Sequence, residues 1–269
     1  LGYSGTSNYG NYVVSDSTLI GFATIASGSG YGTYANNGVI SVTDSTLVHH
    51  RTAVRSSTSQ LADMCIRSSG FDGVTITGND FIDCGVGVQI PSNYYAYNSY
   101  YVGTNGLIGA QNWVVSENTF EDTQNLGAWM YLNAYARNFE FSNNTITGTP
   151  PRYGVYTQDS TTDSAVITGN TIHADNPVYM RGSKSWEIAD NTITGISDAS
   201  RPCIYVLNGF GIIEGNTCTD ADGGISVSGI RSGQIVRIND NTVQYTAGRL
   251  PTAALGIYLD SCGLDEVYM

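Results

Sequence analysis

The sequence predicts an all-β solenoid, a single parallel β-helix of about nine coils whose short strands form three parallel sheets. A four-residue pattern with Asn or Ser in second place recurs nine times, at intervals of 21 to 39 residues. Such a period is typical of solenoids, in which each repeat buries its apolar face against its neighbours. No segment shows the 3.6-residue apolar period of a helix, so we expect very little helix. The marker residues are Ser17, Ser45, Asn79, Asn118, Asn144, Asn170, Asn191, Asn216 and Asn241.

Apolar residues occupy two fixed positions in every copy, three residues before the marker and two residues after it. Side chains of a strand alternate with a period of two, yet these positions are five residues apart, so the chain must turn between them. We expect this turn at the marker itself, because Asn tolerates left-handed backbone angles and bonds its own backbone. Stacked Asn amides can also bond from coil to coil, so we interpret the Asn column as structural and not catalytic. The first apolar column is Val14, Val42, Ile76, Val115, Phe141, Ile167, Ile188, Ile213 and Ile238, and the second is Leu19, Leu47, Phe81, Phe120, Ile146, Ile172, Ile193, Cys218 and Val243.

A further strand follows in each coil from Asn79 onward, and its central residue must point outward because mostly apolar residues flank it. These outward residues form a column that is mostly tyrosine, and neighbouring strands lie about 4.8 Å apart. The sequence therefore predicts an exposed tyrosine stripe, with a mostly polar column two residues further on. The stripe is Gln89, Tyr131, Tyr156, Tyr179, Tyr205, Ser226 and Tyr258, and the second column is Pro91, Asn133, Gln158, Arg181, Leu207, Ser228 and Asp260.

We interpret residues 1–269 as one β-helix domain, because the repeat runs without a break in composition. One coil carries a Tyr-rich insertion at about residues 92–112, and solenoids place binding loops in such insertions. The chain starts without a leader sequence and stops soon after a strand, so we expect a segment of a larger protein whose end coils adjoin further sequence or other protein. The tyrosines of the insertion are Tyr94, Tyr95, Tyr97, Tyr100 and Tyr101.

The composition narrows the range of partners. Asp and Glu outnumber Lys and Arg by 23 to 11, for a net charge of −12. A nucleic-acid partner is disfavoured because phosphate neutralisation needs a basic patch, and no apolar run is long enough for membrane insertion. Neutral partners, or partners bound through calcium, fit this charge best. Asp220 and Asp222 resemble the start of a calcium loop and are candidate ligands, although the later acidic ligand is missing and a plain turn is the alternative.

Five cysteines are present, and their spacing matches no zinc motif. Cys65 and Cys84 bracket one strand–turn–strand unit, so they are candidates for a disulfide in an oxidising compartment. Cys218 occupies an inward position, where we interpret it as a small apolar residue. We predict an extracellular or cell-surface location.

The repeated Asn-Thr-Ile segments, followed by strands such as Gly154-Val155-Tyr156, resemble the right-handed parallel β-helix repeats of the pectate lyase-like superfamily over roughly residues 12–260. The resemblance implies right-handed coils and a substrate groove on the tyrosine face. That superfamily contains polysaccharide lyases, hydrolases, esterases, epimerases, phage tailspikes and adhesins, so the fold alone does not choose a function. The Gly-His-Gly segment of polygalacturonase-like enzymes and the Asp-Pro-His segment of alginate epimerases are absent from the sequence.

The leading hypothesis is carbohydrate recognition through the tyrosine face and the Tyr-rich loop, because aromatic rings supply flat apolar area while hydroxyls bond to sugar oxygens. The first alternative is a polysaccharide lyase or epimerase-like enzyme, with Arg181 and Tyr156 or Tyr179 as candidate catalytic residues and Lys184 and His173 nearby in sequence. The second is a structural segment of a surface fibre, adhesin or tailspike, in which the tyrosines stack on one another or are covered. The predicted ligand-binding residues are Tyr131, Asn133, Tyr156, Gln158, Tyr179, Arg181, Tyr205 and Tyr258, together with Tyr94, Tyr95, Tyr97, Tyr100 and Tyr101.

Overall fold

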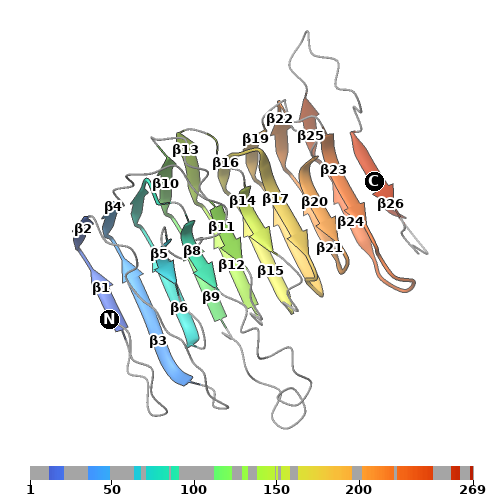
Figure 1. Ribbon diagram of the computed structural model, residues 1–269. Coiled ribbons are helices and arrows are strands. Elements are labelled where there is room, and N and C mark those ends of the chain that lie inside the picture. The colour runs from blue at the N-terminus through green and yellow to red at the C-terminus, as the bar shows by residue number, and fades with distance from the viewer. Residues whose placement is uncertain are drawn as a thin grey trace, which may run out of the picture.

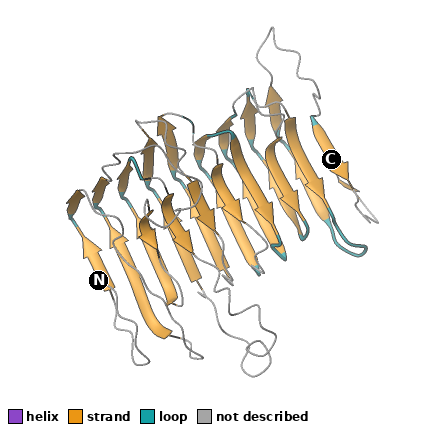
Figure 2. Cartoon of the chain, viewed as in Figure 1, coloured by secondary structure: helices purple, strands orange, loops and turns teal. Residues whose placement is uncertain are grey.

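The structure is a computed structural model that describes residues 12–20, 36–48, 64–67, 71–84, 86–90, 112–122, 129–132, 138–148, 150, 153–157, 163–195, 202–220, 223–244, 256–260 and 267–268. These residues form strands and turns, without any helix (Figure 2). In this part of the chain there is accordingly no helix long and apolar enough to cross a membrane. The strands stack along one axis from the N-terminal to the C-terminal coil (Figure 1). The predicted all-β solenoid is confirmed.

Three parallel sheets of ten, nine and eight strands form the walls of the solenoid. The ten-stranded sheet consists of β1 (Tyr12–Ser15), β3 (Asn36–Thr43), β6 (Phe71–Thr77), β9 (Asn112–Ser116), β12 (Asn138–Ser142), β15 (Ser164–Thr168), β18 (Ser185–Ala189), β21 (Phe210–Glu214), β24 (Val236–Asn239) and β27 (Val267–Tyr268). The nine-stranded sheet consists of β2 (Thr18–Ile20), β4 (Thr46–Val48), β7 (Asp80–Ile82), β10 (Thr119–Asp122), β13 (Thr145–Gly148), β16 (Thr171–His173), β19 (Thr192–Thr194), β22 (Thr217–Thr219) and β25 (Thr242–Gln244). The eight-stranded sheet consists of β5 (Met64–Arg67), β8 (Val86–Ile90), β11 (Trp129–Leu132), β14 (Tyr153–Thr157), β17 (Asn176–Arg181), β20 (Pro202–Leu207), β23 (Gly223–Ser228) and β26 (Ile257–Asp260).

The core lies between the sheets and is built from the two predicted apolar columns. From Val42 to Ile238 every residue of the first column is at most 2% exposed, and the second column is buried from Leu47 to Cys218. Val14, Leu19 and Val243 are only partly buried, because they lie in the outermost described coils and lack a neighbour on one side. The interior is therefore a continuous apolar column along the solenoid axis.

The marker asparagines form an unbroken hydrogen-bond ladder inside the core, from Asn79 to Asn241. From Asn79 to Asn216 each Nδ2 donates to the Oδ1 of the next coil's Asn and to the carbonyl of a core residue in the preceding coil, and the Nδ2 of Asn241 donates to the Ile213 carbonyl. For Asn170 these distances are 2.9 Å to Asn191 Oδ1 and 2.9 Å to the Phe141 carbonyl, and the backbone N–H of Asn170 donates to the same Oδ1 at 3.0 Å. The structural interpretation of the column is confirmed.

The turn at each marker differs from the prediction in one respect. The left-handed residue is the one before the marker, with φ between 48° and 69° in all nine copies, and the marker itself is not left-handed. The reason is that the marker side chain must point into the core to bond in the ladder. The preceding residue therefore breaks the strand alternation, and Gly, Asp and Asn, which tolerate this conformation best, hold eight of the nine positions.

Two disulfides each close a short loop of the chain. Cys65 pairs with Cys84, as predicted, with a Cα–Cα distance of 5.7 Å. Cys218 is buried, as its inward position predicts, but its interpretation as simply a small apolar residue is wrong, because it pairs with Cys203, 15 residues earlier and 6.1 Å away between Cα atoms. Cys203 on β20 is buried, so both sulfurs lie inside the same coil. The fifth cysteine, Cys262, lies outside the described residues.

Replacing both Cys203 and Cys218 with Ala is expected to lower the free energy of unfolding by about 2–4 kcal/mol, because the unfolded chain regains the freedom of a 15-residue loop. Denaturant unfolding of the variant and the wild type measures the difference. The wild type in a strong reductant serves as a second comparison. Identical unfolding midpoints with and without reductant would show that the bridge contributes nothing to stability.

Candidate functional site

Three tyrosines form a stack on the outer face of the eight-stranded sheet. Tyr156, Tyr179 and Tyr205 occupy paired positions of β14, β17 and β20. The ring centroids of Tyr156 and Tyr179 are 5.2 Å apart and those of Tyr179 and Tyr205 are 4.8 Å apart, with interplanar angles of 25° and 23°. The side chains are half-buried rather than exposed, because each ring covers a face of the next.

A fourth tyrosine, which the sequence analysis missed, joins this stack. The Tyr153 ring lies 4.4 Å from the Tyr156 ring and meets the Tyr179 ring edge-on at 5.9 Å. By simple alternation Tyr153 and Tyr156 belong to opposite faces of the strand. The register between β11 and β14 shifts at Gly154, and such an irregularity changes the alternation and places both rings together.

The stack stops at Tyr205 because the next position of the column holds a small residue. Ser226 on β23 is paired with Tyr205 on one side and with Tyr258 on β26 on the other. Tyr258 is 44% exposed. Two aromatic rings thus flank one serine along the outer face, and Asp260 lies two residues beyond Tyr258 on the same strand. We call Tyr205, Ser226, Tyr258 and Asp260 the serine interval.

Charged groups influence the tyrosine nearest to this interval. Burial raises the pKa of the Tyr205 hydroxyl above its usual value of 10.0, Tyr179 and Asp260 add to the rise, and Arg181 opposes it. Arg181 is held in place through its backbone N–H, which donates to Thr157 Oγ1 at 2.8 Å. A cation and a carboxylate therefore both act on Tyr205, whose hydroxyl stays protonated at neutral pH.

The candidate catalytic residues are only partly brought together. Arg181 lies on the same face as Tyr156 and Tyr179 and acts on the neighbouring Tyr205. Lys184 is engaged in a salt bridge with Asp163. His173 lies on β16 of the nine-stranded sheet, so strand topology places it on a different wall of the solenoid.

Other predicted residues extend the face or lie beyond what the structure describes. The Cα atom of Tyr131 is paired with those of Tyr156 and Gln89, so its backbone continues the column. Asp220 lies in a turn with φ of 58°, and its N–H donates to the Gln244 carbonyl at 3.2 Å. Asp222, the second candidate ligand, lies outside the described residues, so calcium binding at this turn stays a prediction. The described ranges contain no group of three or more His, Cys, Asp and Glu that could hold a metal. The residues outside the described ranges are Tyr94, Tyr95, Tyr97, Tyr100, Tyr101, Asn133, Gln158 and Asp222, and with them the insertion at 92–111.

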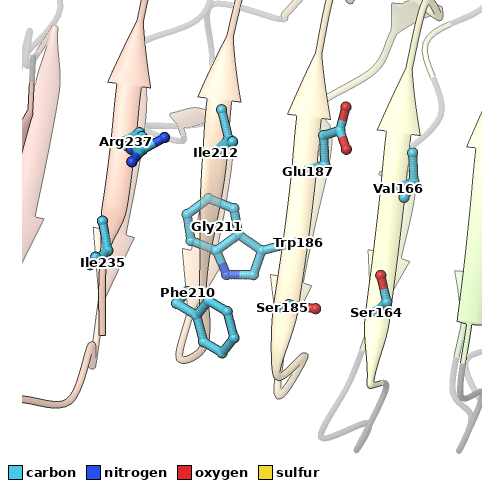
Figure 3. A pocket seen from close by; sticks show the side chains of 10 residues that line it. All are labelled: Ser164, Val166, Ser185, Trp186, Glu187, Phe210, Gly211, Ile212, Ile235 and Arg237. Atoms are coloured by element: carbon cyan, nitrogen blue, oxygen red, sulfur yellow. The ribbon is translucent and has the colours of Figure 1, made fainter. Parts of the chain in front are cut away.

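A second feature, also missed by the sequence analysis, is a hollow on the outer face of the ten-stranded sheet (Figure 3). Its volume is about 330 Å³, and its lining comes from β15, β18, β21 and β24 and from Ile235 just before β24. Phe210 and Ile235 are 44% and 50% exposed. The lining residues are Ser164, Val166, Ser185, Trp186, Glu187, Phe210, Gly211, Ile212, Ile235 and Arg237.

The packing beneath the hollow depends on a large residue beside a small one. Trp186 is buried at 3% exposure, and its indole Nε1 donates to the Asn208 carbonyl at 3.3 Å. Gly211 is paired with Trp186 on the next strand, and a Cβ atom there would collide with the Trp186 carbonyl oxygen and lie 2.7 Å from its ring. Any larger residue at Gly211 would therefore displace the Trp186 strand, so the glycine allows the two strands to form this part of the wall.

Comparison with known proteins identifies the family. The family model described as the right-handed beta helix region matches residues 4–172 and 137–267, two overlapping stretches that span most of the chain. No curated protein and no solved structure matches the chain. The family match agrees with the three stacked parallel sheets and supplies the handedness of the coils. The chain therefore belongs to the family of right-handed parallel β-helix proteins.

Proposed function

We propose that this β-helix recognises a carbohydrate on the outer face of its eight-stranded sheet. The serine interval is the observation that carries the proposal. Neighbouring strands lie about 4.8 Å apart, so Tyr205 and Tyr258, on either side of Ser226, are about 10 Å apart at their Cα atoms. A sugar ring between two aromatic rings needs contacts of about 3.5–4.0 Å on each side, or about 8 Å in all. The spacing therefore suits one sugar ring between the two tyrosines.

Polar groups around the serine interval suit the hydroxyls of a sugar. Ser226 and Ser228 both face outward on β23 and are half-buried. Asp260 supplies a carboxylate, which accepts hydrogen bonds from sugar hydroxyls, and the neutral Tyr205 hydroxyl both donates and accepts. Because the chain carries a net charge of −12, a neutral saccharide is a better ligand than a polyanion.

We further propose that the protein works outside the cell or at the cell surface. Two disulfides support this location, since such bridges form and persist in oxidising compartments. Within this proposal the Tyr-rich insertion at about 92–112 is a second contact region for the same ligand, because insertions of solenoids often carry binding residues.

Two alternatives have some support of their own. A polysaccharide lyase is favoured by Arg181, which acts on Tyr205 from the same face, but the raised pKa leaves less of the Tyr205 hydroxyl as the phenolate that could take a proton at neutral pH. An absorbance assay for β-elimination on uronate polymers tests that activity. A fibre or adhesin segment is favoured by the tyrosines that stack on one another, and in that role no glycan binds to the face.

Replacing Tyr258 with Ala is expected to weaken glycan binding about fivefold or more, because the change removes one of the two rings that hold the sugar, worth about 1 kcal/mol. Tyr258 is 44% exposed, so the melting temperature should change little. An array of neutral oligosaccharides followed by calorimetry measures the affinity.

A matched control is Ile20→Ala, which truncates a residue that is 60% exposed on β2 of the nine-stranded sheet. This variant should bind every glycan as the wild type does. If Tyr258→Ala also keeps every affinity of the wild type, the tyrosine face is not the binding site and the proposal fails.

A further inference from the structure

The hollow of the ten-stranded sheet lies on a different wall of the solenoid from the tyrosine face. Four apolar residues that are not fully buried line it, the exposed Phe210 and Ile235 and the half-buried Ile212 and Val166. Single exposed apolar residues are ordinary on protein surfaces. Four around a hollow of about 330 Å³ are not, because that volume reaches the range of roughly 300–1,000 Å³ found for small-molecule sites. The hollow therefore has the size and lining of a site for a small ligand.

Opposite charges on two of the strands that line the hollow restrict what the ligand can be. Glu187 on β18 and Arg237 on β24 are both paired with Ile212 of the strand between them, and both are exposed. Their Cα atoms are thus about 10 Å apart, two strand spacings. An anion would meet Glu187, and a cation would meet Arg237. A neutral molecule with many hydroxyls satisfies both, because each hydroxyl can donate to the carboxylate or accept from the guanidinium.

The apolar residues add a second requirement. Phe210 presents an aromatic ring on β21, at the opposite end of the hollow's lining from Ile212 (Figure 3), and a ligand that covers it must itself have a flat apolar side. Ser164 and Ser185 contribute hydroxyls along the same rim. The ring of a neutral sugar meets both requirements, since C–H groups cover its faces and hydroxyls surround its edge.

We infer that this hollow is a second binding site, which holds one ring of a neutral saccharide against Phe210 and Ile212 with its hydroxyls bonded to Glu187 and Arg237. The inference goes beyond the proposed function of the tyrosine face, because the two sites share no residue and lie on different sheets. A protein with both sites would bind two separate saccharides independently.

The test compares four proteins on an array of neutral oligosaccharides, followed by calorimetry: the wild type, Phe210→Ala, Glu187→Gln and Tyr258→Ala. We expect a set of saccharides whose affinity falls about tenfold in Phe210→Ala and in Glu187→Gln and stays unchanged in Tyr258→Ala. Both substituted residues are exposed, so the melting temperatures should match that of the wild type. Ile20→Ala again serves as the control for truncation of an exposed apolar residue.

Two outcomes overturn the inference. One is that Phe210→Ala and Glu187→Gln bind every saccharide as the wild type does, whatever Tyr258→Ala does. The other is that the wild type self-associates in light scattering and Phe210→Ala abolishes only that association, which would mean that a second copy of the chain covers the hollow. Saccharide losses in Phe210→Ala with none in Tyr258→Ala would instead support the hollow and refute the proposed function of the tyrosine face.

Discussion

The variant Asn191→Ala is expected to lower the free energy of unfolding by about 3–6 kcal/mol, because it leaves two or three buried polar groups without partners at about 1–3 kcal/mol each. Asn191 is 1% exposed. Its Oδ1 accepts from the backbone N–H and the Nδ2 of Asn170, and its Nδ2 donates to Asn216 Oδ1 and to the Ile167 carbonyl. Water cannot replace the lost amide inside a packed core without a cavity large enough to hold it.

The chain itself provides the matched control for this change. At Ser45 a serine holds the marker position, its N–H donates to Asn79 Oδ1, and its hydroxyl accepts from the N–H of Ser17. Asn191→Ser should therefore recover part of the stability that Asn191→Ala loses. Denaturant unfolding of the three proteins measures both differences. Equal unfolding midpoints for the wild type and Asn191→Ala would show that the ladder does not stabilise the fold.

The fold could be predicted from the sequence because its repeat is carried by interior residues. An inward side chain in a parallel stack touches the same position of the coils above and below, so Val115, Phe141 and Ile167 had to be apolar together. Which residue of the turn becomes left-handed could not be predicted in the same way. Asn tolerates that conformation, yet here its side chain is needed inside the core, and the preceding residue adopts it.

The tyrosine face was predicted in outline, and its packing was not. Strand alternation places Tyr156, Tyr179 and Tyr205 on one face, but side-chain torsions decide whether their rings stack on one another or remain exposed. The position of Tyr153 depends on the irregularity at Gly154, which leaves no distinctive pattern in a single sequence. These features arise from contacts between coils.

The sequence contains an indication of the hollow, in apolar residues next to the inward apolar column of the same strand. Ile213 is inward, so alternation places Ile212 and Phe210 outward on β21, where polar Glu187 and Ser185 hold the paired positions of the strand before. Two apolar residues at outward positions of one strand indicate a functional surface. Their grouping with Ile235 and Arg237 also depends on the register of β24, which only the structure provides.

The variant Ile188→Ala is expected to lower the free energy of unfolding by about 2–5 kcal/mol, the usual cost of such a truncation in a packed core. Ile188 is fully buried and lies in register between Ile167 and Ile213. Its own carbonyl accepts from Asn216 Nδ2 at 2.8 Å, so the backbone around it is fixed by the ladder and cannot easily close the cavity.

Ile188→Val is the conservative comparison for this change, with an expected loss of about 0.5–1.5 kcal/mol. Because each coil of a solenoid contacts only its neighbours, the damage should also be local. Hydrogen exchange should therefore accelerate most in β15, β18 and β21, the strands of Ile167, Ile188 and Ile213, and least in β3 and β6, which lie several coils away. Unchanged stability in Ile188→Ala would mean that the coils can close around the missing side chain, and uniformly faster exchange along the chain would mean that the solenoid unfolds as one cooperative unit.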